Sequence, residues 1–252
     1  DVQQAVDAVR WCVDNGLRCV MIPTMWLEHD PYHHVKYDPF WEVCEDLGVV
    51  IHFHSGPAPH PEYFGRDWPA EDNSDQFPGA MGAYVSEVMW WLYRPLTFMI
   101  WGGVFERFPR LKTMIVEGGT LFMLPPWLRL LDHNYEDVQF SAKLGDFRSH
   151  LSMSPSDYFQ RNCGIGASCV PRRDLDLREA IGTVLIMWGS DYPHPEGTWP
   201  HTAEYYQETF AGFPEDAGRK ILGENAIQFY GLDRSHLQAV ADDIGPQSTL
   251  FH

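Results

Sequence analysis

Two residues that can bind metal or transfer protons, Asp191 and His194, follow a short apolar run. The run at residues 184–187 is typical of a buried strand, and Gly189-Ser190 lets the chain turn sharply out of a sheet. Asp191 is therefore expected at the carboxyl end of a strand, where α/β barrels carry their catalytic and metal-binding residues. The alternative is that Asp191 caps a helix or braces the turn.

A pair of histidines, His52 and His54, lies in a second apolar run at residues 49–54. Because successive side chains of a strand alternate between its faces, residues two apart point to the same side. Neutral imidazole is the commonest metal ligand in proteins, which makes the pair a candidate binding site. The alternative is that each histidine is a satisfied core residue, although the Ser55-Gly56 turn that follows favours an open strand end.

A third apolar run, at residues 113–119, carries a carboxylate, Glu117, near its end. In the dry mouth of a barrel this carboxyl group would have a raised pKa and could transfer protons. Pairing with an arginine near the end of the barrel is an equally good explanation. Both explanations place Glu117 at the carboxyl end of a strand.

The elements that must position these residues alternate between strands and helices. We expect strands near residues 19, 49, 113, 160 and 184, the fourth over 159–168, and helices at 2–15, 38–47, 79–107, 121–138, 173–182, 202–211, 214–221 and 223–230. The helix at 79–107 contains Arg94-Pro95, where proline interrupts helical hydrogen bonding, so a break is expected there. The alternation predicts an α/β fold in which crossover helices join parallel strands.

The composition is that of an ordinary soluble globular protein. Of 252 residues, 44% are hydrophobic and 21% are charged, and one domain is the default for this length. The formal net charge of -17 opposes binding to nucleic acids and anionic membranes. No apolar run is long enough to span a membrane, and no secretory signal is expected. The cysteines form no Cys-x-x-Cys pair, so we expect core thiols at Cys12, Cys19 and Cys44 and a reducing, cytoplasmic location.

Five stretches of the sequence resemble the amidohydrolase-related family, in the expected order. They are residues 37–41, 50–56, 108–112, 188–194 and 222–226. Segment 188–194 is similar to the last barrel strand of the branch that includes aminocarboxymuconate-semialdehyde decarboxylase. The resemblance covers most of residues 3–233. It implies a TIM-type (β/α) barrel and metal-dependent hydrolysis or non-oxidative decarboxylation of a small carboxylated or aromatic substrate.

The resemblance also implies a role for each candidate residue. His54 and Asp191 would bind a divalent metal, zinc being the expected ion, and Asp191 could instead take the proton of a bound water. Glu117 and His194 are candidates for proton transfer and substrate contact, although many family members carry a histidine at the position of Glu117. The remaining substrate contacts are expected from His52, Trp188 and Tyr192.

The same resemblance implies strands that are missing from this sequence. The family places a His-x-His or Glu-x-His motif on its first strand, and no such motif precedes Cys19. We therefore expect an incomplete, amino-terminally truncated barrel that lacks about its first three strands, or a natural smaller variant. The barrel would occupy residues 1–235, and residues 236–252 would form a loosely ordered tail or contact a neighbour. With two expected ligands absent, metal binding is expected to be weak or absent.

Two functions therefore remain open for the chain. It is either an enzyme acting on a small molecule or a catalytically incomplete barrel that binds a small molecule or partner without metal. In both cases we expect a homo-oligomer, because unpaired strand edges must be covered. The aromatic-rich segment 89–101 and the long loop at 57–78 are the expected contact regions.

Overall fold

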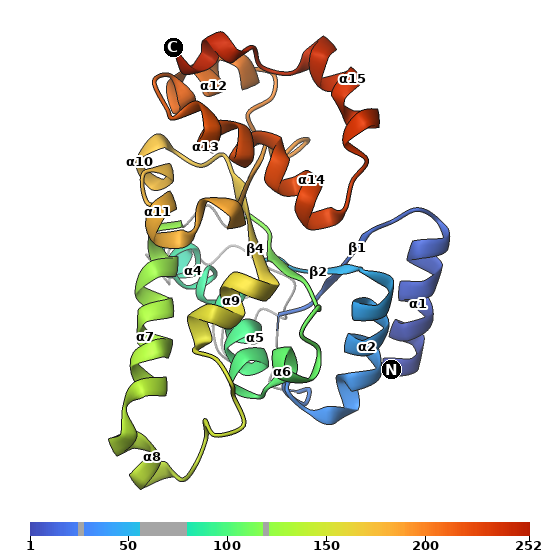
Figure 1. Ribbon diagram of the computed structural model, residues 1–252, viewed down its shortest axis with the longest axis vertical. Helices are drawn as coiled ribbons and strands as arrows, with labels where there is room; N and C mark the ends of the chain where they lie inside the picture. The colour runs from blue at the N-terminus through green and yellow to red at the C-terminus, as the bar shows by residue number, and fades with distance from the viewer. Residues whose placement is uncertain (25–27, 56–79, 118–120) are drawn as a thin grey trace. The chain divides into compact units, whose positions relative to one another are not determined.

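The computed structural model describes residues 1–24, 28–55, 80–117 and 121–252 (Figure 1). They form two compact units, Asp1–Ile115 with Tyr135–Asn162 and Val116–Asn134 with Cys163–His252. Each unit combines parallel strands with helices, which confirms the expected α/β fold. The predicted loop at 57–78 lies outside the described residues.

The first unit contains three parallel strands. They are β1 (Cys19–Ile22), β2 (Val50–Phe53) and β3 (Thr113–Ile115). Val50 pairs with Cys19, and Ile51 pairs with both Val20 and Thr113, so β2 lies in the middle. Its buried residues Val50, Ile51 and Phe53 form the nearly continuous hydrophobic run typical of parallel sheets.

The second unit contains two parallel strands. They are β4 (Cys163–Ser168) and β5 (Ile186–Gly189), with Ile165 opposite Ile186 in the register. The five strands of the described residues lie near their predicted positions. The fourth begins at Cys163, whereas residues 159–162 belong to the preceding helix. Phe159 misled the prediction because its apolar side chain is buried on that helix.

Helices make up most of the remaining described structure. In the first unit they are α1 (Val2–Asp14), η1 (Val35–Tyr37), α2 (Asp38–Leu47), α4 (Ala80–Glu87), α5 (Trp90–Trp101), α6 (Val104–Arg107), α8 (Val138–Leu144) and α9 (Pro155–Asn162). In the second they are η2 (Leu121–Met123), most of α7 (Leu124–Glu136), α10 (Arg172–Leu175), α11 (Arg178–Ile181), η3 (Thr183–Leu185), α12 (Thr202–Phe210), α13 (Glu215–Arg219), η4 (Lys220–Glu224), α14 (Asn225–Tyr230), α15 (Arg234–Ile244) and η5 (Ser248–Phe251). Among the described residues, no helix combines the length and hydrophobicity needed to cross a bilayer.

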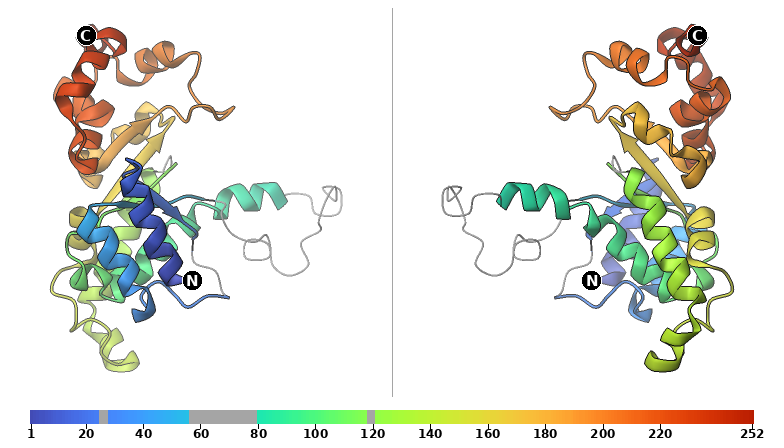
Figure 2. Two further views of the ribbon diagram at one scale, coloured as in Figure 1. Left: turned by 90° about the vertical axis from the view of Figure 1, so that its right-hand side faces the viewer. Right: turned by 90° about the vertical axis from the view of Figure 1, so that its left-hand side faces the viewer.

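Local sequence explains why α1 and α2 form where they do. The carboxylate of Asp1 accepts a hydrogen bond from the backbone N–H of Gln4, which satisfies an orphan donor of the first turn of α1. Helix α2 ends at Gly48, whose left-handed φ of 65° suits a residue without a Cβ. The two helices lie side by side, while α4 extends away from the strands of this unit (Figures 1 and 2).

Two buried asparagines fix the chain next to strands. Nδ2 of Asn162 donates to the carbonyl oxygens of Pro109 and Leu111, just before β3. Nδ2 of Asn225 donates to Thr183 and Ile186, at the start of β5, with both distances 2.8 Å. Each amide therefore satisfies two carbonyls, a role that an apolar side chain could not perform.

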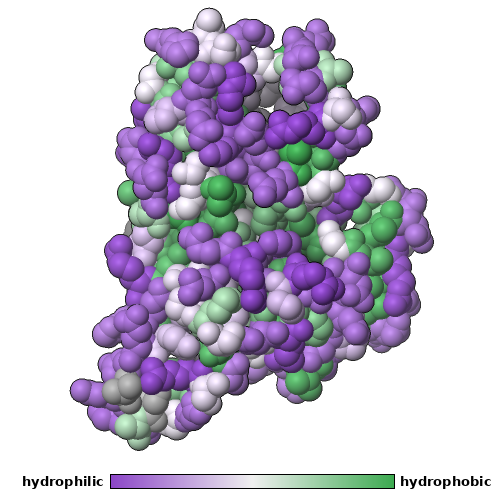
Figure 3. Space-filling model, in the orientation of Figure 1, coloured by the Kyte–Doolittle hydropathy of each residue, from purple (hydrophilic) through white to green (hydrophobic). Residues whose placement is uncertain are grey.

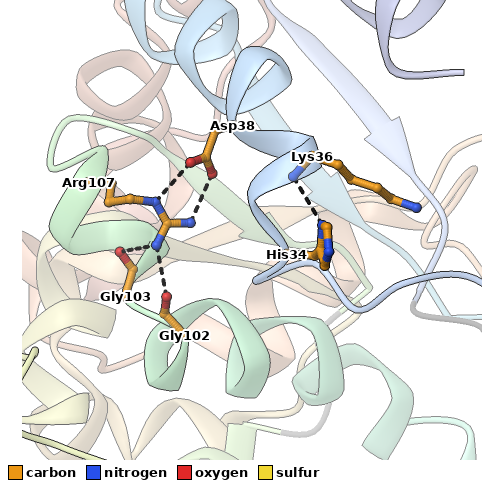
Figure 4. Close-up of polar contacts among 6 residues, drawn as sticks. All are labelled: His34, Lys36, Asp38, Gly102, Gly103 and Arg107. Carbon is orange, nitrogen blue, oxygen red and sulfur yellow. Dashed lines mark hydrogen bonds and ion pairs between the residues drawn. The ribbon is translucent and has the colours of Figure 1, made fainter.

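An arginine clamp joins α2 to the end of α6 (Figure 4). Nε and Nη2 of Arg107 donate to the two carboxylate oxygens of Asp38, at 3.2 and 2.9 Å. Nη1 of Arg107 donates to the carbonyl oxygens of Gly102 and Gly103. The bidentate geometry is the strong form of this ion pair. Just before α2, the backbone N–H of Lys36 donates a hydrogen bond to Nδ1 of His34.

Three further expectations differ from the structure. Helix α5 continues through Pro95, because the buried side chains of Leu92, Leu96 and Met99 hold it in place, and the interruptions fall at residues 88–89 and 102–103.

Strand β1 is not buried, since Met21 is 61% exposed and Cys19 is also exposed. The segment expected to be loose contains α15 and η5, and Phe251 packs so closely on Gly218 that a Cβ there would lie 2.2 Å from its ring. The domain boundary at 235 stays a prediction.

Candidate active site

Three residues just beyond strand ends share an unusual backbone conformation. Glu117 follows β3 by two residues, Cys169 directly follows β4, and Asp191 follows β5 by two residues. Their φ angles are 53°, 49° and 60°, and they are the non-glycine residues with positive φ in the described part of the chain. Side chains rarely tolerate this conformation, and such residues cluster at functional sites.

The loop after β5 brings Asp191 and His194 together. Oδ2 of Asp191 lies 3.4 Å from Nδ1 of His194, and the backbone N–H of His194 donates to the carbonyl of Asp191 at 2.7 Å. The carboxylate is 19% exposed and the imidazole 52%, so both groups can reach a ligand. The loop therefore brings a carboxylate and an imidazole close together in this unit.

Gly197 allows the same loop to close. A Cβ at this position would lie 2.8 Å from the carbonyl oxygens of Asp191 and Ser190, and 3.0 Å from that of His194. Backbone oxygens cannot move away as the end of a flexible side chain can. The tight loop therefore depends on glycine here.

Cys169 is a candidate site residue that the sequence did not single out. Its thiol donates to the carbonyl of Glu196 at 3.5 Å. Burial raises the pKa of the Cys169 thiol, and the negative charges of Asp191 and Glu117 raise it further. Both carboxylates are therefore close enough to Cys169 to influence its ionisation. Cys163, the other cysteine of this segment, begins β4 and is buried.

Trp188, on β5, presents an unused hydrogen-bond donor. Its indole Nε1 is buried and has no acceptor among the described residues. The ring contacts Tyr205 and Tyr206, with centroids 6.4 and 4.8 Å away. Burial raises the pKa of both tyrosines to about 12, so they remain neutral and apolar in character. Tyr192 is 65% exposed and packs edge-on against Trp199, with the centroids 5.8 Å apart.

The two histidines of the first unit have different environments. His52 lies on β2, and burial lowers its pKa from 6.5 to about 4, so its imidazole is neutral near pH 7. His54 follows the last residue of β2, and its Nδ1 contacts the carbonyl of Ser55. His54 belongs to the first unit and Asp191 to the second, so the metal site expected from these two residues stays a prediction.

Whether a metal ion fits depends on how many donor side chains come together. Within the described ranges, no group of three His, Cys, Asp or Glu side chains is close enough to hold a metal ion. A catalytic zinc normally takes three protein ligands. The described residues therefore do not by themselves provide a complete metal site.

Comparison with known proteins places these features in a family. A family model described as amidohydrolase matches residues 1–232. A curated relative, 2-amino-3-carboxymuconate-6-semialdehyde decarboxylase of Dictyostelium discoideum, is 26% identical over 201 residues, which are 77% of this chain and 48% of the relative. The chain thus spans about half the length of this relative.

Solved structures share the fold at low sequence identity. The 5-carboxyvanillate decarboxylase of Sphingomonas paucimobilis has a TM-score of 0.67 and 24% identity, over 92% of this chain and 65% of the other. A dihydroxybenzoic acid decarboxylase of Polaromonas sp., solved with manganese and 2-nitroresorcinol, has a TM-score of 0.65 and 21% identity, over 94% and 68%. Since the family match extends over nearly the whole sequence and agrees with the parallel α/β architecture, the chain belongs to the amidohydrolase family.

Proposed function

We propose that this chain acts in metal-dependent, non-oxidative decarboxylation or hydrolysis of a small carboxylated or aromatic compound. The observation that carries the proposal is the Asp191–His194 pair on the loop after β5, next to the strand-end residues Glu117 and Cys169. The decarboxylases named among the relatives support decarboxylation as the first reaction to test. The proposed architecture is a TIM-type (β/α) barrel, supported by the parallel strands and the structural neighbours.

Proton transfer is assigned to Glu117 and His194. In decarboxylation, the bond between the substrate carbon and its carboxylate breaks, carbon dioxide leaves, and a proton must be delivered to that carbon. A carboxyl group or an imidazolium can deliver this proton if it lies within hydrogen-bond reach. Asp191, 3.4 Å from His194, would stabilise the protonated imidazole between turnovers.

Substrate contacts are assigned to Trp188, Tyr192 and His52. The buried indole N–H of Trp188 has no acceptor among the described residues, so it is suited to donate to a substrate oxygen. The exposed ring of Tyr192 offers an aromatic surface. The neutral imidazole of His52 can donate or accept a hydrogen bond without adding charge.

A divalent metal, zinc or the manganese named for a relative, would polarise the substrate when bound. His54 and Asp191 are its proposed ligands. These are fewer than the three ligands of a typical catalytic zinc, so no step is assigned to metal and weak metal binding is expected. We also propose a cytoplasmic location, supported by five cysteines that remain thiols, and a homo-oligomeric state.

The second candidate function is a barrel that binds a small molecule or partner without metal. The observation that favours it is that no three-ligand group forms among the described side chains. The two candidates differ in turnover. Only the enzyme would convert substrate and respond to added metal.

The test is a turnover assay on purified protein with three acids, 5-carboxyvanillate, 2,6-dihydroxybenzoate and 2-amino-3-carboxymuconate semialdehyde. Each acid is incubated with zinc, with manganese or with a chelator, and the decarboxylated product is measured by chromatography. Metal-dependent product from at least one acid would support the enzyme. Saturable binding of an acid without product under any metal condition would support the binding protein instead.

A further inference from the structure

Helix α12 (Thr202–Phe210) contacts the carboxyl-terminal parts of both β4 and β5. The hydroxyl of Tyr205 donates a hydrogen bond to the carbonyl oxygen of Val170, two residues past the end of β4. The next residue, Tyr206, lies against Trp188 on β5, with the ring centroids 4.8 Å apart. Consecutive residues of one helix therefore contact the exits of two neighbouring strands.

A second attachment fixes the other end of α12. Nη1 of Arg172, on α10, donates to the carbonyl oxygens of Thr209 and Ala211, at 3.2 and 2.9 Å. The last carbonyls of a helix have no partner within the helix, so the guanidinium satisfies groups that would otherwise stay open. The segment just after β4 is therefore joined to α12 at two points, and the hydroxyl of Tyr205 provides one of them.

The segment that Tyr205 holds contains a strained residue. Cys169, directly before Val170, has a φ of 49°, a conformation that residues with a side chain rarely adopt. Such a residue keeps its conformation only where the surrounding contacts hold it. The backbone N–H of Cys169 donates to the carbonyl of Gly189 at 3.2 Å, on the side of β5. The hydrogen bond from Tyr205 to Val170 holds the same segment on the side of α12.

Cys169 also connects this segment to the loop after β5. The carbonyl of Glu196 accepts a hydrogen bond from the thiol of Cys169 at 3.5 Å. The backbone N–H of Glu196 donates to Nδ1 of His194 at 3.3 Å, and the same nitrogen lies 3.4 Å from the carboxylate of Asp191. A series of contacting residues thus leads from the hydroxyl of Tyr205 to the imidazole of His194, entirely within the second unit.

We propose that Tyr205 is a positioning residue, whose hydroxyl holds the exit of β4 and, through Cys169 and Glu196, the loop that carries His194. Tyr205 is assigned no contact with substrate and no proton transfer. Its effect on turnover rests on the proposed function, whereas its hold on the exit of β4 can be measured without any substrate.

The reactivity of Cys169 measures that hold. Tyr205→Phe removes the hydroxyl and keeps the ring, so Val170 loses one hydrogen bond. The full chain is treated with iodoacetamide, and labelling of each cysteine is followed by mass spectrometry. Labelling of Cys169 should become about fivefold faster in the variant, as expected for the loss of one hydrogen bond. An unchanged rate at Cys169 would overturn the proposal.

Two controls separate local release from general loosening of the fold. Cys44 and Cys163 are buried, and both should stay as slowly labelled in Tyr205→Phe as in the original protein. Tyr206→Phe is the matched variant, because the hydroxyl of Tyr206 makes no hydrogen bond with a described residue. It should leave the labelling of Cys169 unchanged. Equal acceleration at all three cysteines, or equal effects of the two variants, would refute a specific role for the Tyr205 hydroxyl.

Kinetics test whether the hold reaches His194. With an acid that the original protein converts, Tyr205→Phe should lower kcat about tenfold and change KM by less than about twofold, because a displaced proton donor affects the reaction more than substrate binding. Faster labelling of Cys169 with an unchanged kcat would overturn the link to His194. If the original protein converts no acid, the proposed function fails, and the labelling of Cys169 alone decides whether Tyr205 holds the exit of β4.

Discussion

Oδ2 of Asp191 lies 3.4 Å from Nδ1 of His194, and both residues belong to the loop that leaves β5. This geometry lets the carboxylate stabilise a protonated imidazole, which is the state that a proton donor must reach in each cycle. It is also compatible with a carboxylate that simply holds the loop. A change that keeps the shape of the side chain but removes its charge separates these roles.

The first prediction concerns Asp191→Asn. If the charge is needed, turnover of the acid identified in the assay should fall by about 10²–10⁴-fold, the usual contribution of acid–base groups. The melting temperature should change little, because the amide can fill the same space. Asp243→Asn, an exposed residue of α15, should keep full turnover as the matched control. Turnover of Asp191→Asn within about twofold of the original would assign the carboxylate to the loop alone.

The second prediction concerns Gly197→Ala. The added methyl group would lie 2.8 Å from the carbonyl oxygens of Asp191 and Ser190, so the loop must open. We expect a loss of about 1–3 kcal/mol in the free energy of unfolding, as for other overpacked positions. Gly223→Ala is the control, since a Cβ there meets nothing within 4 Å. Urea unfolding of both variants measures the difference, and equal losses would contradict the crowding argument.

The third prediction is a pH dependence of stability caused by His52. Burial lowers its pKa in the folded protein from 6.5 to about 4. Between these values the unfolded chain binds a proton that the folded chain does not, so stability falls as the pH drops from about 6.5 towards 4. The contribution lost is about 3 kcal/mol for a shift of this size.

Urea unfolding between pH 7 and pH 4.5 tests this assignment. His52→Leu should flatten the pH dependence, whereas His201→Leu, at a side chain that is 78% exposed, should leave it unchanged. Parallel curves for the original protein and His52→Leu would show that another group is responsible.

The fourth prediction is self-association through the region of α1 and β1. Trp11 and Met21 are each 61% exposed, and hydrophobic side chains gather on the visible surface over α1 (Figure 3). Strand β1 pairs with β2 alone among the described strands of its unit, and an open strand edge favours contact with another chain. Light scattering should give a mass that is a multiple of 29.0 kDa.

Substitution at the strand locates this contact. Met21→Lys should shift the mass towards that of one chain, because a charge on an edge strand opposes pairing. Val240→Lys, at an exposed apolar residue of α15, should have no effect. A mass near 29 kDa for the original protein over a wide concentration range would refute the prediction.

The sequence identified where strands and helices occur better than where they begin. Apolar runs located all five strands, but Phe159 extended the fourth one backwards into α9, because a buried helical residue and a buried strand residue are equally apolar. Cys169 was missed although the predicted strand already ended at Ser168, because its positive φ and the nearby charges of Asp191 and Glu117 are visible only in the structure. Exposure of Met21 was also beyond the sequence, since an apolar run does not reveal which strand lies at an edge.

The candidate site was predicted from chemistry and spacing where both were local. Asp191 and His194 were identified because they follow one strand and one turn, and the structure places them in contact. Trp188 was expected to contact substrate, but its unused indole N–H depends on long-range packing that no local pattern encodes.

The left-handed residues Glu117, Cys169 and Asp191 have a consequence for engineering the protein. Glycine adopts this conformation without steric penalty, whereas each side chain costs of order 1 kcal/mol or more. Replacing each of these residues with glycine should therefore relieve backbone strain and raise the melting temperature. The larger conformational entropy that glycine gives the unfolded chain opposes this gain. Such a gain would reveal a trade-off between the stability of the fold and the activity of the site. It can be measured by calorimetry before any substrate is known.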